Sequence, residues 1–145
     1  MDRTLLDIMP ANSRRLLLRA NAVFLIVAAV GAWVTADFPA SFLGSGPIGS
    51  LIAHQPALGI GFIEAHGLAI ILGVLLWRAA STTSWHLTGA AIHLLLGTCN
   101  VIFWQLFIAT NTLPMGWITT VMHGLLFVLQ SLAAWSAARD AAGNV

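Results

Sequence analysis

Charged residues are scarce in this sequence. Only 8% of its 145 residues are Asp, Glu, Lys or Arg, whereas about a quarter are charged in an ordinary soluble domain. The net charge is +1 and the basic residues form no clustered face, which excludes nucleic acid as a partner. Hydrophobic residues make up 59% of the chain, and the mean hydropathy is +0.90. The composition therefore predicts an integral membrane protein embedded in a lipid bilayer.

The sequence also lacks most of the patterns that indicate catalysis. Its single cysteine, Cys99, excludes an intramolecular disulfide and any paired-cysteine metal or redox motif. No His-x-x-x-His spacing, no phosphate-binding loop and no nucleophile with a base at fixed spacing is present, so we predict no metal site and have no reason to predict an enzyme. The segment 1–19 lacks the short apolar core and cleavage site of a secretory signal peptide, which we do not expect here.

Four long apolar runs predict an all-α fold. At about 1.5 Å per residue, each run is long enough to cross a hydrocarbon core of ~30 Å. Short turns after the second and third runs require antiparallel neighbours, so we predict one polytopic membrane domain, a four-helix up-down bundle. The expected helices cover about residues 16–36, 57–77, 85–109 and 115–137.

The connection between the first two helices is unusual. Asp37, Pro39 and the Gly44–Pro47 cluster predict that the first helix ends near residue 36. The segment 38–56 is too apolar for a free loop, since it contains Phe38 and Phe42 among its Ser and Gly residues. We therefore predict a short interfacial segment that caps the outer mouth of the bundle.

The arginines predict the orientation. If four helices alternate in direction, every arginine falls on the side of the N-terminus, and the positive-inside rule then places both termini in the cytoplasm. The arginines are Arg3, Arg14, Arg15, Arg19, Arg78 and Arg139.

Polar residues inside the predicted spans indicate a binding pocket. Glu64 is the only acid within them, and a charge near the middle of a bilayer costs at least ~2.5 kcal/mol unless it is paired or neutralised. Counting from the outer ends places Glu64, Asn100 and His123 about 10 to 15 Å deep, with His93 and Gln130 deeper. We predict a ligand pocket formed by Glu64, His93, Asn100 and His123.

His66 and Gln130 are secondary candidates. Glu64 and His66 are two residues apart and therefore point about 160° away from each other on a helix. Because the carboxylate is the costlier group to expose to lipid, we predict that Glu64 faces the bundle interior, flanked by Gly61 and Gly67. His66 would then face a helix contact or a partner protein.

The segment Phe62–Ala80 resembles part of a known family. Glu64, Gly67, Gly73 and Arg78 fit the pattern of the second helix in the DoxX-like group of small four-helix bacterial membrane proteins. The resemblance implies a multi-pass protein of the bacterial inner membrane, of a kind that often works beside oxidoreductases or quinone-linked systems.

Three functions remain open at this point. The first is binding of a small molecule or quinone, or service as a subunit beside a redox complex, through the predicted pocket. The second is a b-type haem protein with His66 and His123 as axial ligands. The third is a structural or assembly subunit, which contacts a partner membrane subunit or forms a homo-oligomer.

Overall fold

The computed structural model describes residues 9–143. Residues 1–8 lie outside this range. They include Arg3, one of the arginines that predict the orientation, and the beginning of the segment 1–19, in which no signal peptide is expected. Within residues 9–143 every regular element is a helix, which confirms the all-α prediction. The elements are α1 (Ala11–Ala32), the π-helix η2 (Trp33–Asp37), α2 (Phe38–Leu43), α3 (Gly49–His54), α4 (Ala57–Arg78), α5 (Thr83–Ile102), α6 (Trp104–Ala109) and α7 (Leu113–Gly143).

Three stretches of the described chain are long and apolar enough to cross a bilayer, which fits the prediction of transmembrane helices, although four such spans were predicted. The three stretches are Ala11–Leu43, Ala57–Arg78 and Leu113–Gly143. The remaining long helix, α5, has 20 residues, carries His86, His93 and Asn100, and is not among these three stretches.

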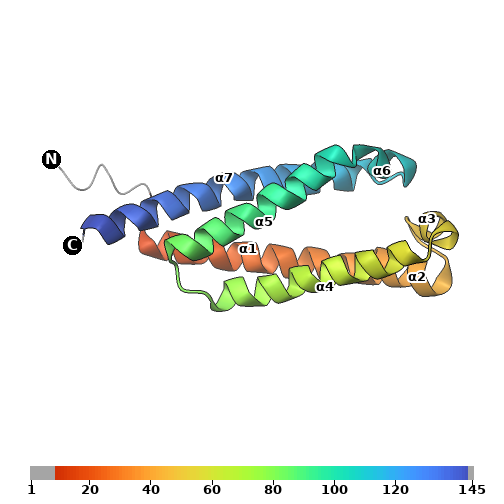
Figure 1. The fold of residues 1–145 in the computed structure, drawn as a ribbon, viewed down its shortest axis with the longest axis horizontal. Coiled ribbons are helices and arrows are strands. Elements are labelled where there is room, and N and C mark those ends of the chain that lie inside the picture. The colour runs from red at the N-terminus through yellow and green to blue at the C-terminus, as the bar shows by residue number, and fades with distance from the viewer. Residues whose placement is uncertain (1–8, 144–145) are drawn as a thin grey trace.

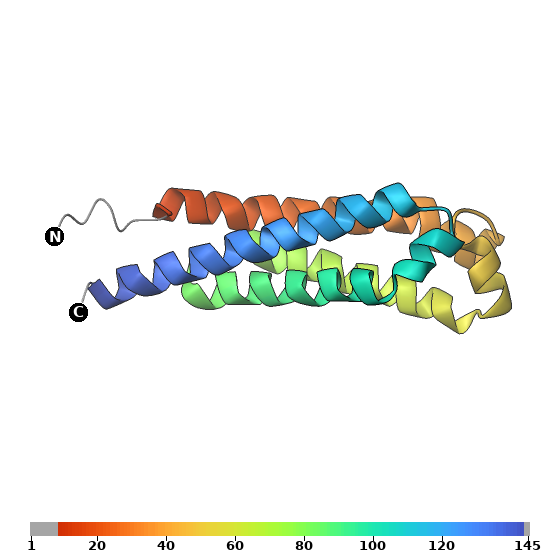
Figure 2. The ribbon, with the colours of Figure 1, turned by 90° about the horizontal axis from the view of Figure 1, so that it is seen from above.

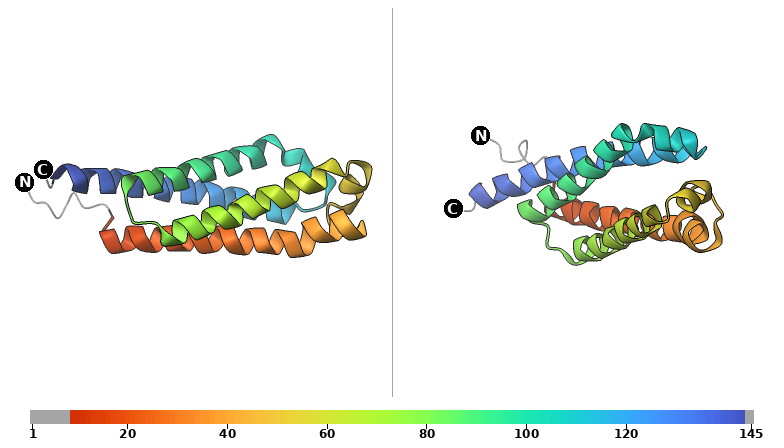
Figure 3. Two further views of the ribbon diagram at one scale, coloured as in Figure 1. Left: turned by 60° about the horizontal axis from the view of Figure 1, so that its bottom comes forward. Right: turned by 45° about the vertical axis from the view of Figure 1, so that its right-hand side comes forward.

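The long helices form two antiparallel hairpins (Figure 1). One contains α1 and α4, connected through α2 and α3, and the other contains α5 and α7, connected through α6. The hairpins lie close together at the end that carries both chain termini, here named the terminal end. They diverge toward the opposite, far end, where α2, α3 and α6 lie (Figure 3). Contacts between the hairpins therefore concentrate toward the terminal end.

The first helix does not end near residue 36, because it continues through η2 into α2. The N–H of Phe38 donates to the carbonyl of Trp33, five residues earlier. This wider turn accommodates Pro39, which has no N–H and whose ring would clash with a carbonyl in a regular α-helix. Gly44, with a positive φ of 61°, ends α2. Asp37 is thereby placed inside a membrane-length helix.

The segment 38–56 folds as two short helices at the far end (Figure 2). Ala40, Ile48 and Ile52 form a small apolar cluster, against which Phe62 of α4 packs. The segment thus packs on its own α1/α4 hairpin. That it caps the outer mouth of the bundle stays a prediction.

The α1/α4 hairpin depends on a close approach between its two helices. A Cβ atom added to Gly73 would lie 2.7 Å from Cγ1 of Ile26 and 3.0 Å from the carbonyl oxygen of Ala22. Only glycine leaves that space free, so α1 and α4 pack tightly there. A core of Leu18, Ala22, Leu25 and Leu76 continues this contact, and Trp85 and Ile92 of α5 pack against it.

Candidate functional site

The first polar pair connects α1 to α4 near the far end. Nδ1 of His66 lies 2.6 Å from Oδ2 of Asp37, and the Asp37 side chain is only 1% exposed. Nearby, the indole Nε1–H of Trp33 donates to the carbonyl of Ile63 at 3.1 Å. The π-helical turn and the indole together hold this Asp37–His66 pair in register.

The predicted orientation of α4 is wrong. Glu64 is exposed, and it is His66 that faces α1. Glu64 is not the only acid that needs a partner, because Asp37 is a second acid within the helical span, and His66 is the residue that reaches it. Gly73 also lies on the His66 side of α4, since seven residues bring a helix back to almost the same face. The apolar residues Phe38–Leu43 that follow Asp37 are the signal that could have placed it within a helix.

The second polar cluster links the two hairpins. Nε2 of His93 on α5 lies 2.6 Å from Oδ1 of Asn21 on α1, and Nδ1 of His93 lies 2.9 Å from Nδ1 of His123 on α7. With neutral rings, the Nε2–H of His93 donates to Asn21 and the Nδ1–H of His123 donates to His93. Phe24 packs against both imidazoles. Both nitrogens of His93 are therefore engaged within the protein.

Gln130 belongs to a neighbouring chain of contacts. Its Oε1 lies 2.6 Å from Nδ1 of the buried His86, whose Nε2 lies 2.9 Å from the hydroxyl of Ser81. Gly89 provides the space for this arrangement, since a Cβ there would lie 3.0 Å from Cδ of Gln130 and 3.2 Å from Nδ2 of Asn21. These contacts hold α5 against α7 and α1.

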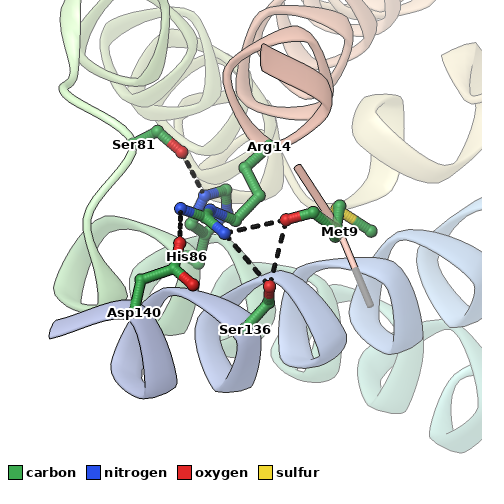
Figure 4. Close-up of polar contacts among 6 residues, drawn as sticks. All are labelled: Met9, Arg14, Ser81, His86, Ser136 and Asp140. Carbon is green, nitrogen blue, oxygen red and sulfur yellow. Dashed lines mark hydrogen bonds and ion pairs between the residues drawn. The ribbon is translucent and has the colours of Figure 1, made fainter. Parts of the chain in front are cut away.

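A cluster of hydrogen bonds around Arg14 lies at the terminal end (Figure 4). The buried Arg14 guanidinium donates to Asp140 at 2.6 Å, to Ser136 at 3.0 Å and to the carbonyl of Met9 at 2.8 Å. Ser136 also donates to the Met9 carbonyl. This cluster joins the start of α1 to the end of α7, so we assign it a structural role.

A shallow, open groove of about 340 Å³ lies between α5 and α7, and we name it the α5–α7 groove. Its volume is within the range of small-molecule sites. Thr120 lines it, and the Oγ1 atom of Thr120 is buried without a hydrogen-bond partner among the described residues. The lining residues are His93, Leu94, Gly97, Thr98, Val101, Ile102, Thr120, Gly124 and Phe127. The groove is thus mostly apolar, and one of its lining residues carries a buried hydroxyl without a partner among the described residues.

The structure brings together only part of the predicted pocket. His93 lines the groove and contacts His123. Asn100 donates instead to the hydroxyl of Thr119 at 3.0 Å, which is an interhelical contact. Glu64 lies on the other hairpin and is exposed. Sequence reasoning missed Thr120 as a groove residue, because one threonine among several on an apolar helix carries no distinguishing signal.

The predicted haem ligands do not come together. His66 pairs with Asp37 in the α1/α4 hairpin, whereas His123 pairs with His93 between α5 and α7. This donor set does not fit a haem ligated by both His66 and His123. Among residues 9–143, no group of three or more His, Cys, Asp or Glu side chains is arranged to hold a metal ion.

Comparison with known proteins adds no family assignment. No family model matches the chain, and no curated protein or solved structure matches it significantly.

Proposed function

We propose that this protein binds a small lipid-soluble molecule with a hydrogen-bonding headgroup, of the quinone class, in the α5–α7 groove. The observation that carries the proposal is the buried hydroxyl of Thr120, a residue that lines the mostly apolar groove and whose Oγ1 has no partner within the described chain. A buried unpaired polar group costs about 1–3 kcal/mol, and a ligand oxygen that accepts its hydrogen bond would remove that cost.

The groove suits such a ligand in shape and chemistry. A quinone carbonyl can accept from the Thr120 hydroxyl, while the flat ring packs against Phe127 and the imidazole of His93. Because both nitrogens of His93 are engaged, its role is to shape the groove. The exposed side chains of Val101 and Ile102 offer an apolar surface to the tail of the ligand.

Filling the groove should abolish this binding. A Cβ added to Gly124 meets no atom within 4 Å, so Gly124→Leu is expected to preserve the fold while its side chain occupies the groove. We expect binding of a short-chain ubiquinone to protein in nanodiscs to weaken at least ~10-fold, which corresponds to about 1.4 kcal/mol. Equilibrium binding to nanodiscs with and without protein measures the effect.

Gly31→Leu is the matched control, since Gly31 on α1 also has open space around it and does not line the groove. It should bind the quinone as the wild type does. Thr120→Val, which removes only the hydroxyl, should weaken binding about 5-fold if one neutral hydrogen bond of ~1 kcal/mol is lost. Binding by Gly124→Leu at wild-type affinity would contradict the proposed site.

We also propose the full membrane arrangement: four spanning helices in a bacterial inner membrane, with both termini in the cytoplasm. Among the described residues, Arg14, Arg15 and Arg19 lie near the start of α1, Arg78 at the end of α4, and Arg139 near the end of α7. All five are at the terminal end, which supports a cytoplasmic location for it. Arg19 and Arg139 stack on Trp77 and Trp135, as expected in a membrane interface. The resemblance to the DoxX-like group agrees with this arrangement and remains a prediction.

Reporter fusions test the arrangement. An alkaline phosphatase fused at Ser45, between α2 and α3, should be active because it is exported, and a fluorescent protein fused at Val145 should fluoresce because it stays in the cytoplasm. An inactive phosphatase at Ser45 with stable expression would place the far end in the cytoplasm and contradict the proposed orientation.

A further inference from the structure

Three arginines of the α1/α4 hairpin lie at the terminal end of its two helices. Arg15 precedes Arg19 by four residues, so both side chains lie on one face of α1. The Arg19 guanidinium stacks on the Trp77 ring of α4, with its Cζ atom 5.4 Å from the ring centroid. Arg78 follows Trp77 and ends α4. All three arginines are exposed, and we name them the arginine patch: Arg15, Arg19 and Arg78.

No acidic side chain of the described chain balances the charge of this patch. The described acids are Asp37, Glu64 and Asp140, and the first two lie in the far half of the hairpin. The ion pairs among the described residues join Arg14 to Asp140 and His66 to Asp37, so none of them includes a patch arginine. An arginine side chain keeps its charge in proteins. The patch therefore presents three positive charges to a ligand.

Exposed apolar side chains continue from the patch toward the far end. Trp77, with 49% of its surface exposed, lies next to the patch, and Val74 and Leu75 of α4 follow one turn deeper. Val23 of α1, also exposed, lies one turn deeper than Arg19. Along a membrane-spanning helix, this order of charge, aromatic ring and apolar surface matches the order of headgroup, interface and hydrocarbon in a bilayer. The surface thus suits a ligand with an anionic head and apolar tails.

We propose that the arginine patch binds the phosphate headgroup of an anionic phospholipid, whose acyl chains lie along the exposed apolar surface of the α1/α4 hairpin. Guanidinium groups match phosphate oxygens in geometry and form charge-assisted hydrogen bonds with them. Stacking on Trp77 restricts the Arg19 side chain before the lipid arrives, so less conformational entropy is lost on binding. Clusters of basic residues at the ends of membrane helices bind anionic headgroups in this way.

The choice of a lipid follows from both parts of this surface. Inorganic phosphate would neutralise the arginines, but it would leave the adjoining apolar side chains uncovered. Asp2 and Asp7, which lie outside the described residues, are the competing partners, and they predict that the protein has no preference for anionic lipid. The patch is on α1 and α4 and the groove is between α5 and α7, so this inference does not depend on the proposed function.

Native mass spectrometry of the purified full-length chain tests the proposal. Phosphatidylglycerol and phosphatidylcholine with the same acyl chains are titrated into the detergent-solubilised protein, and the Kd of the first bound lipid is measured. We expect phosphatidylglycerol to bind at least ~10-fold more tightly, since each arginine near an anionic headgroup contributes about fivefold to the affinity. Inorganic phosphate at the same concentration as the lipid should not displace it.

Charge-removing variants locate the binding site. Arg19→Gln and Arg78→Gln should each weaken binding of phosphatidylglycerol about fivefold and leave binding of phosphatidylcholine unchanged. Arg139→Gln is the matched control, because Arg139 stacks on Trp135 with its Cζ atom 5.0 Å from the ring centroid and is the one arginine of α7. This control removes the same charge from an isolated position, so its affinity for phosphatidylglycerol should stay within about twofold of the wild type.

Three results would overturn the proposal. Equal affinity of the wild type for the two lipids would show that the patch does not select an anionic headgroup. An equal loss in Arg19→Gln and Arg139→Gln would show that only net charge attracts the lipid. Displacement of phosphatidylglycerol by inorganic phosphate would assign the patch to free phosphate. Circular dichroism and gel filtration confirm that each variant is folded.

Discussion

Asp37→Ala is expected to lower the free energy of unfolding by about 3 kcal/mol, the low end of the range for breaking a buried ion pair. Asp37 is almost fully buried, and its carboxylate lies 2.6 Å from Nδ1 of His66. The alanine variant leaves His66 without its partner at the contact of α1 with α4. We choose the low end because 32% of the His66 side chain is exposed, so the protein fully encloses only one partner of the pair. Reversible unfolding by SDS in bicelles measures the change.

A double-mutant cycle separates the pair from the general effect of each substitution. His66→Ala should also destabilise the protein, but the double variant should cost less than the sum of the single ones, because neither partner is left unpaired. Replacing both by leucine should recover stability further, as apolar replacements of buried ion pairs often do. Additive losses would show that Asp37 and His66 do not interact in the folded protein.

Gly73→Leu is expected to cost about 2–3 kcal/mol, since it inserts a side chain into a tightly packed contact. Even the first atom of that side chain would lie 2.7 Å from Ile26 and 3.0 Å from the backbone oxygen of Ala22. Ile26 can change its rotamer, but the backbone of α1 must move away from α4. The same unfolding experiment measures the loss.

Gly31→Leu provides the comparison for this substitution as well. Gly31 has the same residue type and a helical position, but no atom lies within 4 Å of an added Cβ. We expect its unfolding free energy to stay within about 0.5 kcal/mol of the wild type. If Gly31→Leu and Gly73→Leu lowered the free energy of unfolding equally, the close approach of α1 at Gly73 would not explain the loss. The replacement of a helical glycine by leucine would then be its cause.

Continuous apolar runs predicted the long helices, but not all of their ends. The third helix was expected to cover 85–109, whereas α5 ends at Ile102 and α6 (Trp104–Ala109) follows as a separate short helix. The second run was expected at 57–77, and α4 covers Ala57–Arg78. The end of the first helix could not be predicted in this way. Asp37 and Pro39 are strong local signals for a helix end, but a π-helical turn and the pairing of Asp37 with His66 override them.

The candidate site was harder to predict, because it depends on how each helix is rotated. His93 and His123 were expected to face inward, and they do contact each other. Glu64 was expected to join them from α4, and the rotation of that helix was decided by Asp37, a residue of a different helix. Periodicity within one helix cannot reveal such a partner. For the same reason, the free hydroxyl of Thr120 becomes visible only when its neighbours are placed.

Photoaffinity labelling tests the central claim most directly. A quinone with a photoreactive group on its headgroup is activated in nanodiscs that contain the wild-type protein, and labelled peptides are identified by mass spectrometry. We predict labels within 94–102 on α5 and within 120–127 on α7, suppressed by excess unlabelled quinone and lost in Gly124→Leu. Labels that gather on α4 around Glu64, or labels that excess quinone does not suppress, would contradict a binding site in the α5–α7 groove.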